Sequence, residues 1–236
     1  MSRPLDVVAA LTQVSRDFRT PQDLDTTLHT LVTVARDSTP GADHVSISVR
    51  LTDDPMHTVA ATDDVARTLA DLQQELGEGP CLDVMDVDVL IRSDHLGDEP
   101  RWPRFAARAV DLGVCSYVGV RLLAEEHTVG ALSMYSTSAD ALTDEAVQMA
   151  DLFAAHAGLA LGHARRIENL NAALQTRQVI GLALGMIMQR LDLDENTAFA
   201  YLTRVSATTE TKLRDVAAAM VQQHQERLGR PTRPAP

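Results

Sequence analysis

Apolar residues recur every three or four positions in the first part of the chain and then change to strict alternation. Residues 5–14 and residues 24–35 both follow helical spacing, which predicts two amphipathic helices separated by a break at Pro21. The turn residues 38–41 end the second helix. From Val45 to Leu51 apolar and polar residues alternate, which predicts a strand with one buried and one solvated face. The chain therefore begins with helices that lead into a sheet.

Helices and strands alternate as far as Tyr135. Asp63 is suited to cap a helix that Gly77 ends, because an Asp oxygen accepts from free N–H groups and Gly adopts the left-handed conformation. The other expected elements are strands at 57–61, 89–91, 117–123 and 128–135, a helix at 105–112, a stiff turn at 77–82, and a turn at Glu125-Glu126. Strands joined by short turns pair antiparallel, so we expect an α+β domain around an antiparallel sheet, with its helices gathered on one face.

A long helix is predicted from Asp144 to about Arg190, because this span contains no proline and only single glycines. Within it, apolar residues fall on alternating steps of three and four, the spacing of a coiled coil. This stripe consists of Phe153, Ala157, Ala160, Ala164, Ile167, Asn171 and Leu174. Asn171 favours a parallel pair of helices in register, since its amide is satisfied by its counterpart. The alternative is that the stripe packs within one chain against the helix at residues 5–14.

Three helical segments close the chain. Their apolar positions predict inward faces at Val179, Ile180, Ala183, Met186 and Ile187, at Ala198, Phe199, Leu202 and Val205, and at Leu213, Val216, Ala217, Met220 and Val221. Asp194 is the expected cap of the second segment. Residues 229–236 are predicted to form a disordered basic tail.

Charge is divided unevenly along the chain, whose net charge is −12. Residues 176–236 contain eight Lys or Arg and six Asp or Glu, a net of +2, which leaves −14 for the remainder. The basic C-terminal part is a weak indication of an anionic partner. Aromatic residues make up only 3% of the chain, which argues against a domain that recognises RNA on a broad aromatic surface.

The N-terminal segment and the two cysteines indicate a cellular compartment. No run is long enough to span a membrane, and Asp6 and Arg16 interrupt the apolar pattern that a signal peptide needs. Two cysteines do not form a disulfide scaffold in a chain of this size. We therefore expect a reduced, cytoplasmic protein.

The three terminal helices contain a recognisable pattern. The segment from Arg177 to Arg190, RQVIGLALGMIMQR, resembles the opening of the ANTAR domain, a family of RNA-binding antiterminators. The resemblance continues through Leu193-Asp194-Glu195, Ala198-Phe199, Leu202, Ser206, Lys212-Leu213-Arg214 and Val216-Ala217. It implies a dimer that binds two stem-loops in nascent RNA and so prevents transcription termination. Leu184 stands where the family often has Lys, and Glu210 where it often has Asn; both changes reduce phosphate contact.

The preceding region resembles a GAF domain of the kind that accompanies ANTAR domains in actinobacterial proteins. The matching residues are Gln73, Gly77-Glu78-Gly79-Pro80-Cys81, Arg101-Trp102-Pro103, Gly113, Ser116 and Gly130-Ala131-Leu132. Together the two resemblances predict an N-terminal helix (1–20), a GAF-like sensor domain (21–142), a coiled-coil linker helix (143–175), an all-α three-helix ANTAR domain (176–228) and the tail (229–236). They also imply that a small-molecule signal is sensed by the GAF-like domain, although its ligand is unknown.

Candidate site residues follow from these two domains. The expected RNA-binding residues are Arg177, Gly185, Arg190, Arg204, Ser206, Thr209, Lys212 and Arg214. Gly185 lies inside a helix, where it indicates close approach of RNA or of another helix, and Ser206 and Thr209 have capping of the third helix as their alternative role. The candidate sensor residues are Cys81, Trp102 and Cys115. The two cysteines are either a redox-switchable pair or two buried side chains, and Trp102 either fills the core or lines a pocket.

No catalytic residue, metal site or cofactor is expected, because the histidines have no metal-ligand spacing and no base lies near Cys81 in the sequence. Neither DNA nor a membrane is an expected partner. Two rival functions remain. One is a thiol-based enzyme of the GAF-like sulfoxide reductase type, with Cys81 as the nucleophile. The other is a protein-interaction module in which the terminal helices dock onto another regulator.

Overall fold

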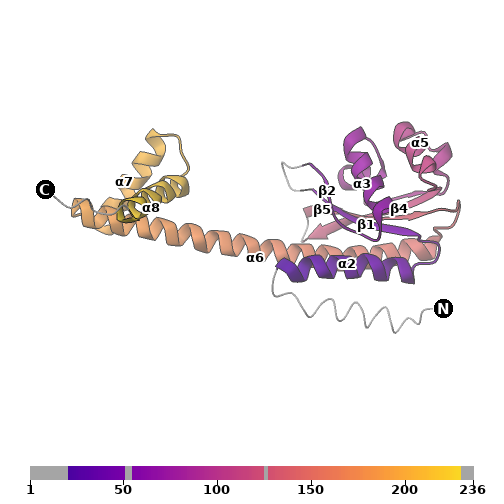
Figure 1. The fold of residues 1–236 in the computed structure, drawn as a ribbon, viewed down its shortest axis with the longest axis horizontal. Helices are drawn as coiled ribbons and strands as arrows, with labels where there is room; N and C mark the ends of the chain where they lie inside the picture. Colours follow the sequence, from indigo (N-terminus) through magenta and orange to yellow (C-terminus); the bar gives the residue numbers. More distant parts are fainter. Residues whose placement is uncertain (1–20, 51–54, 125–126, 230–236) are drawn as a thin grey trace. The chain divides into compact units, whose positions relative to one another are not determined.

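The computed structural model describes residues 21–50, 55–124 and 127–229 (Figure 1). The predicted helix at residues 5–14, Leu51, the turn at Glu125-Glu126 and the tail beyond Gly229 lie outside the described residues. The chain divides into two compact units, residues 1–165 and residues 166–236. We describe each unit by itself.

Twelve helices and strands and one short 3-10 helix make up the described chain. In order they are α2 (Pro21–Ser38), β1 (His44–Val49), β2 (His57–Ala61), α3 (Asp64–Leu76), α4 (Pro80–Asp86), β3 (Leu90–Ser93), η1 (Leu96–Asp98), α5 (Pro103–Asp111), β4 (Ser116–Ala124), β5 (His127–Ser136), α6 (Asp144–Leu191), α7 (Glu195–Thr208) and α8 (Leu213–Gly229). Apart from α4 and η1, each corresponds to an element that the hydrophobic pattern predicts.

The strands of the first unit form a five-stranded antiparallel sheet in the order β2-β1-β5-β4-β3. The hairpin of β1 and β2 pairs Ile47 with Ala60, and the central pair of β4 and β5 sets Val120 opposite Leu132. The predicted α+β fold around an antiparallel sheet is confirmed.

Helices cover both faces of this sheet, so the expectation that they gather on one face is wrong. Figure 1 shows α3 and α5 on one side, and α2 with the first part of α6 on the other. The strands alternate accordingly: on β4, Val118 and Val120 pack with α2 and α6, whereas Tyr117 packs with α3, α4 and α5. Both faces of the central strands are apolar enough to bury, and each face therefore needs its own layer of helices.

Strand β1 shows why the apolar/polar alternation led to this wrong prediction. Val45 and Ile47 are buried against α2 and α6, as predicted. Ser46 and Ser48, which the alternation assigns to solvent, are 0% and 1% exposed. A small hydroxyl side chain can be covered by a helix at low cost, and an apolar/polar pattern alone does not distinguish such a serine from a solvated one.

The segment between α3 and α5 contains a helix that sequence analysis missed. Asp63 caps α3, with the Ala66 N–H donating to Asp63 Oδ1 at 3.0 Å, and Gly77 ends it at φ 62°, both as predicted. The expected stiff turn at 77–82 is wrong in its second half, because α4 begins at Pro80. Proline at the first helical position has no N–H to leave unpaired, and so starts a helix as readily as it stiffens a turn.

Helix α6 begins as a structural part of the first unit. Its residues Phe153, Ala157 and Ala160 are fully buried against the sheet and α2. These are the first three positions of the stripe that we assigned to a coiled coil, and they are therefore not available to a second chain. The coiled-coil stripe as predicted is wrong in this half, and the face of α6 that stays exposed is a different one.

The second unit is a cluster of three helices formed by the end of α6, α7 and α8. Its core contains Ala183, Leu184, Ile187, Ala198, Leu202, Val216 and Ala217. Asp194 caps α7 as predicted, since its Oδ1 accepts from the Thr197 N–H at 2.7 Å. Phe199, which we expected to point inward, is 47% exposed, because Ala198 and Leu202 already fill the contact that α7 makes.

Candidate functional site

The predicted RNA-binding cations of the second unit all have exposed side chains. Within the part of the chain that the structure describes, Arg177, Arg190 and Lys212 take part in no ion pair. An exposed cation without a carboxylate partner keeps its full charge available for an external anion. The set therefore has the electrostatic character that a phosphate-binding surface requires.

The other two cations contact neighbours on their own helices. The Arg204 guanidinium lies 5.7 Å from the centre of the Tyr201 ring, a cation–π contact across one helical turn. Arg214 Nε lies 3.3 Å from Asp215 Oδ1, with both side chains more than half exposed. An exposed ion pair of this kind contributes little free energy, so a phosphate can displace Asp215 from Arg214 at little cost.

Gly185 lies on an exposed face of α6. A Cβ added at this position would meet nothing within 4 Å. Among the described residues there is therefore no tight helix packing at this glycine, which weakens the helix by about 1 kcal/mol relative to Ala.

Ser206 and Thr209 shape the turn between α7 and α8. The Thr209 hydroxyl donates to the Val205 carbonyl at 2.8 Å, and the Ser206 hydroxyl donates to the Thr211 carbonyl at 2.6 Å. Neither bonds to an N–H group of α8, so the predicted capping of the third helix is wrong. Both side chains instead satisfy carbonyl groups, and they hold a turn in which Glu210 adopts φ 51°.

Cys81 is a buried residue in the first turn of α4. Its side chain is fully buried, and its Sγ lies 3.7 Å from Met56 Sδ. Burial raises the pKa of the Cys81 thiol to about 11. A thiol with this pKa is almost entirely protonated at neutral pH, and the thiolate is the reactive form. Of the interpretations offered for Cys81, the structure favours a buried packing residue.

Cys115 is only partly buried and lies at the end of the sheet, where its N–H donates to the Ser136 carbonyl at 2.8 Å. The Cys81 side chain lies beside Ser133, and Ser133 comes three residues before Ser136 on β5. Three residues of a strand span about 10 Å, whereas a disulfide needs Cα atoms within about 7 Å. The structure therefore does not bring the two thiols together.

Trp102 is part of the core beneath α4 and α5. It is 2% exposed, and its indole N–H donates to Asp83 Oδ2 at 2.8 Å. The Arg101 guanidinium lies 4.2 Å from the ring centre. Of the two roles considered for Trp102, the structure favours core filling, with Asp83 satisfying the one polar atom of the ring.

A network of buried polar side chains beside Cys81 was missed by sequence analysis. The Gln73 amide donates to Tyr135 Oη at 3.3 Å and accepts from the Cys81 N–H at 2.7 Å. Tyr117 Oη and Ser133 Oγ lie 3.0 Å apart. The one sequence signal was Gln73 in the middle of an apolar helix face, because a buried amide needs polar partners. The partners come from strands more than 40 residues away, and their proximity follows only from the fold.

Glu78 is a second residue whose role only the structure shows. Its Oε1 accepts from the Phe105 N–H at 2.9 Å, and its Oε2 accepts from Arg104 Nε at 2.9 Å. These bonds hold the pKa of Glu78 below its ordinary value, the Phe105 N–H contributing most. The turn after α3 thus caps the start of α5 and fixes the two helices to each other.

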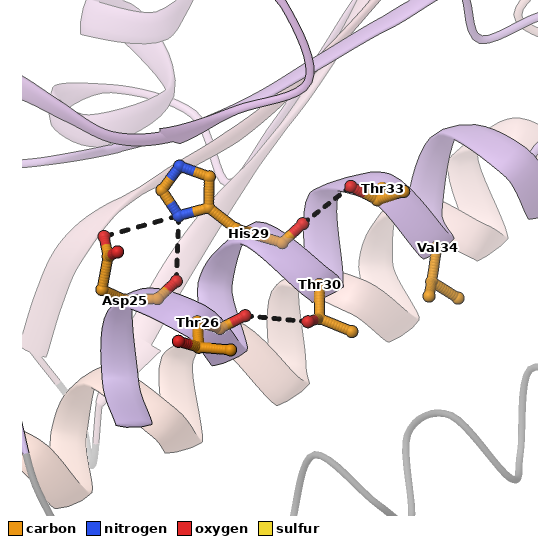
Figure 2. Close-up of a pocket in the computed structure, with 6 residues that line it drawn as sticks. All are labelled: Asp25, Thr26, His29, Thr30, Thr33 and Val34. Carbon is orange, nitrogen blue, oxygen red and sulfur yellow. Dashed lines mark hydrogen bonds and ion pairs between the residues drawn. The ribbon is translucent and has the colours of Figure 1, made fainter. Parts of the chain in front are cut away.

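A shallow depression on the exposed side of α2 is shown in Figure 2 and is lined by Asp25, Thr26, His29, Thr30, Thr33 and Val34. The hydrogen bonds among its residues run along the helix: Thr30 to the Thr26 carbonyl at 2.8 Å and Thr33 to the His29 carbonyl at 2.9 Å. All of its residues come from one helix, and we assign no function to it.

Across residues 21–50, 55–124 and 127–229, no three His, Cys, Asp or Glu side chains come together as a metal site would require. In the same ranges, no helix combines the length and apolarity needed to cross a membrane.

Comparison with known families decides the identity of both units. The model of the GAF domain matches residues 21–162, more than half of the chain. The chain belongs to the GAF domain family. The model of the ANTAR domain matches residues 168–221, so the GAF domain of this chain is followed by an ANTAR domain. GAF domains are signal-sensing domains and ANTAR domains are RNA-binding antiterminator modules.

Solved structures confirm the fold of the GAF domain. The chain is similar to the GAF domain of an Acinetobacter phosphoenolpyruvate-protein phosphotransferase, with 16% identity and a TM-score of 0.54 over 72% of this chain and 99% of that one. It is also similar to a free methionine-R-sulfoxide reductase from Neisseria meningitidis, with 12% identity and a TM-score of 0.53 over 68% and 89%.

A third similar structure is the photosensory core module of a Stigmatella aurantiaca phytochrome, with 15% identity and a TM-score of 0.52 over 87% of this chain and 46% of that one. At these identities the likeness establishes the fold alone. A search of curated proteins found no significant match.

Proposed function

We propose that this protein is a signal-responsive transcription antiterminator whose ANTAR domain binds hairpin loops in nascent RNA. The observation that carries the proposal is the exposed cationic set of the second unit, in which Arg177, Arg190 and Lys212 have no carboxylate partner among the described residues. A compact helical domain with few aromatics recognises an ordered loop through its shape, phosphates and a few base edges. Because nascent transcripts are the proposed target, we propose that the protein acts in the cytoplasm.

The protein acts as a homodimer that binds two stem-loops at once. Each ANTAR domain contacts one loop, and binding of the paired hairpins stabilises an antiterminator structure that excludes the overlapping terminator. The second hairpin then binds at the effective concentration that the first provides, which raises affinity without new contacts. In the same domain, the exposed Gly185 allows close approach of the RNA, and the exposed Thr209 and the partly buried Ser206 shape the α7–α8 turn.

The GAF domain senses the signal, which we propose is a small molecule. The Ser46 and Ser48 hydroxyls are buried on the sheet face beneath α3 and α4, where Ser46 lies beside the Tyr135 phenol and Ser48 beside the Cys81 thiol. These side chains form a buried polar group within an otherwise apolar core. A polar ligand that reaches this face would find hydroxyl groups to bond to.

Binding to paired and single hairpins tests the proposed mechanism. RNA that co-purifies with the protein supplies the sequences, and a gel-shift titration at low salt compares one hairpin with two. We expect the paired RNA to bind roughly tenfold more tightly or better, because linking two weak sites commonly adds a factor of this order or more. Equal affinities for one and two hairpins would contradict the dual-site mechanism.

A thiol-based enzyme is the second candidate, favoured by the sulfoxide reductase among the structural neighbours. The buried Cys81 thiol, with its pKa raised to about 11, disfavours it. Cys81→Ser separates the two functions: it leaves RNA binding unchanged in an antiterminator and abolishes turnover in a thiol enzyme.

The salt dependence of binding distinguishes RNA recognition from docking of the terminal helices onto a protein. The affinity of an apolar contact falls little as the salt concentration rises, whereas the affinity for RNA falls steeply.

A further inference from the structure

Helix α6 carries a line of large apolar side chains that the structure leaves exposed. They are Leu152, Leu159, Ile167, Leu170 and Leu174, each between 37% and 71% exposed. An α-helix turns about 100° per residue, so all five fall within an arc of about 80°. We call this arc the leucine line. It is distinct from the face of α6 that packs in the GAF domain, where Phe153, Ala157 and Ala160 are buried.

The leucine line has an eleven-residue period. Steps of four, three and four residues, repeated from Leu152, pass through His156, Leu159, His163, Ile167, Leu170 and Leu174. Eleven residues in three turns give about 3.67 residues per turn, so the line runs almost straight along the helix. The seven-residue pattern that the sequence suggested drifts away from this face. For this reason it mixed the buried positions Phe153 and Ala157 with the exposed positions Ile167 and Leu174.

The length of the leucine line limits what can cover it. From Leu152 to Leu174 it extends about 33 Å at 1.5 Å per residue. Among the described helices other than α6, the longest are α2, with 18 residues, and α8, with 17. Both already pack in the cores of their own units. The partner that matches the length and period of the line is a second copy of α6.

We propose that two chains pair through their leucine lines, with the two α6 helices parallel and in register. In this arrangement each apolar residue of the leucine line meets its counterpart, and His156 and His163 likewise each meet their own counterparts. In an antiparallel pair Leu170 would lie opposite His156 and apolar layers would be interrupted. Beyond Leu174 the same line reaches Gln178 and Gly181, which have no large apolar side chain, so the tight apolar contact ends at Leu174.

This inference rests on the proposed dimer and specifies which face forms it. It separates the roles of the two faces of α6: one closes the core of the GAF domain and the other joins two chains. The last leucine of the line, Leu174, comes three residues before Arg177, the first cation of the ANTAR domain, which lies one turn further along the same face of α6.

Single cysteines on α6 test the pairing in the full-length chain. In a background with Cys81→Ala and Cys115→Ser, Leu170→Cys is oxidised and the disulfide-linked dimer is followed with time. Asn171→Cys is the matched control, because Asn171 is exposed on the same turn but points about 100° away. We expect Leu170→Cys to cross-link at least about tenfold faster, since a disulfide needs Cα atoms within about 7 Å. Faster cross-linking at Asn171, or a chain that sedimentation shows to be monomeric, overturns the proposal.

A mixing experiment tests the direction of the helices. Equal amounts of His156→Cys and Leu170→Cys chains are oxidised together, and the mixed dimer is compared with the two like dimers. Parallel pairing in register gives the like dimers, whereas a dominant mixed dimer shows an antiparallel pair and overturns the proposal.

RNA binding provides the independent readout. Leu170→Asp is expected to abolish the preference for paired hairpins and to leave single-hairpin affinity unchanged. Leu182→Asp, an exposed leucine outside the leucine line, serves as the control and should keep the preference. If both variants keep the preference, the leucine line is not the pairing surface. If cross-linking occurs at Leu170 but the wild-type chain binds no hairpin, the proposed function fails and the pairing stands.

Discussion

Asp63 links three segments of the GAF domain through one carboxylate. Its Oδ1 accepts from the Ala66 N–H at 3.0 Å, and its Oδ2 accepts from His44 Nδ1 and from the Thr62 hydroxyl, each at 2.9 Å. Burial alone would raise the pKa of Asp63, but these hydrogen bonds together hold it below its ordinary value. The ionised side chain therefore stabilises the start of α3 and ties it to β1.

Asp63→Ala is expected to lower the free energy of unfolding of the GAF domain by about 1 kcal/mol at pH 7, the usual cost of losing a helix cap. Because the folded-state pKa is lowered, the contribution is present above the unfolded pKa of about 3.9 and is lost as the pH falls through the folded value. Urea unfolding followed by the fluorescence of Trp102, the single tryptophan, measures this. Identical unfolding midpoints at pH 7 for wild type and variant would contradict the assigned role.

Single residues were predictable where local chemistry determines them. The caps Asp63 and Asp194 and the helix end at Gly77 follow from the needs of the first and last turns of a helix, and the structure confirms all three. The burial of Ser46 and the partners of Gln73 depend on elements distant in the sequence. Local pattern carries no information about them.

At the scale of elements, the sequence predicts most helices and strands but not which face each one buries. The spacing of apolar residues in α6 predicts a helix. Whether the helix buries the face with Phe153 or the face with Leu159 depends on where the sheet lies. Phe199 is a similar case, since helical spacing allows it to point inward but Ala198 and Leu202 already fill the contact. Helix α4 was missed because it has only seven residues and begins with Pro80 directly after Gly79, a pair that is typical of a turn.

Gly185→Ala distinguishes the internal stability of α6 from its external contacts. The added Cβ meets open space in the structure, so we expect α6 to become more stable by up to about 1 kcal/mol, the difference in helix propensity. We also expect weaker hairpin binding, because the methyl group separates the helix from RNA. Gly181→Ala is the matched control, since its Cβ also meets nothing within 4 Å. Thermal unfolding and gel shifts measure the two effects, and unchanged RNA affinity in Gly185→Ala would remove this residue from the binding surface.

At the scale of the whole molecule, charge is divided unevenly along the chain. Residues 176–236 carry a net charge of +2 and the rest of the chain −14, so the C-terminal part is the one that favours an anionic partner. Helix α6 contains residues of both the GAF domain and the ANTAR domain in one continuous element from Asp144 to Leu191. A signal that alters the packing of Phe153 or Ala157 therefore acts on the same helix that forms part of the RNA-binding unit.

The two domain families were the most predictable feature of the chain. Motifs such as Gly77 to Cys81 and Arg177 to Arg190 indicated both families, and the family models confirm them over residues 21–162 and 168–221. The extent of the GAF domain was harder to predict, because residues such as Phe153 look like part of a linker helix until the sheet beneath them is known.

The salt dependence of hairpin affinity tests the central claim most directly. The dissociation constant of the paired-hairpin RNA is measured across a series of salt concentrations for wild type, for Lys212→Gln and for Arg108→Gln, an exposed cation of the GAF domain that serves as the control. We predict steep loss of wild-type affinity with salt, a slope of log affinity against log salt reduced by roughly 1 in Lys212→Gln, and no change of slope in Arg108→Gln. Binding that is insensitive to salt, or equal slopes in all three proteins, would contradict RNA recognition by the exposed cations of the ANTAR domain.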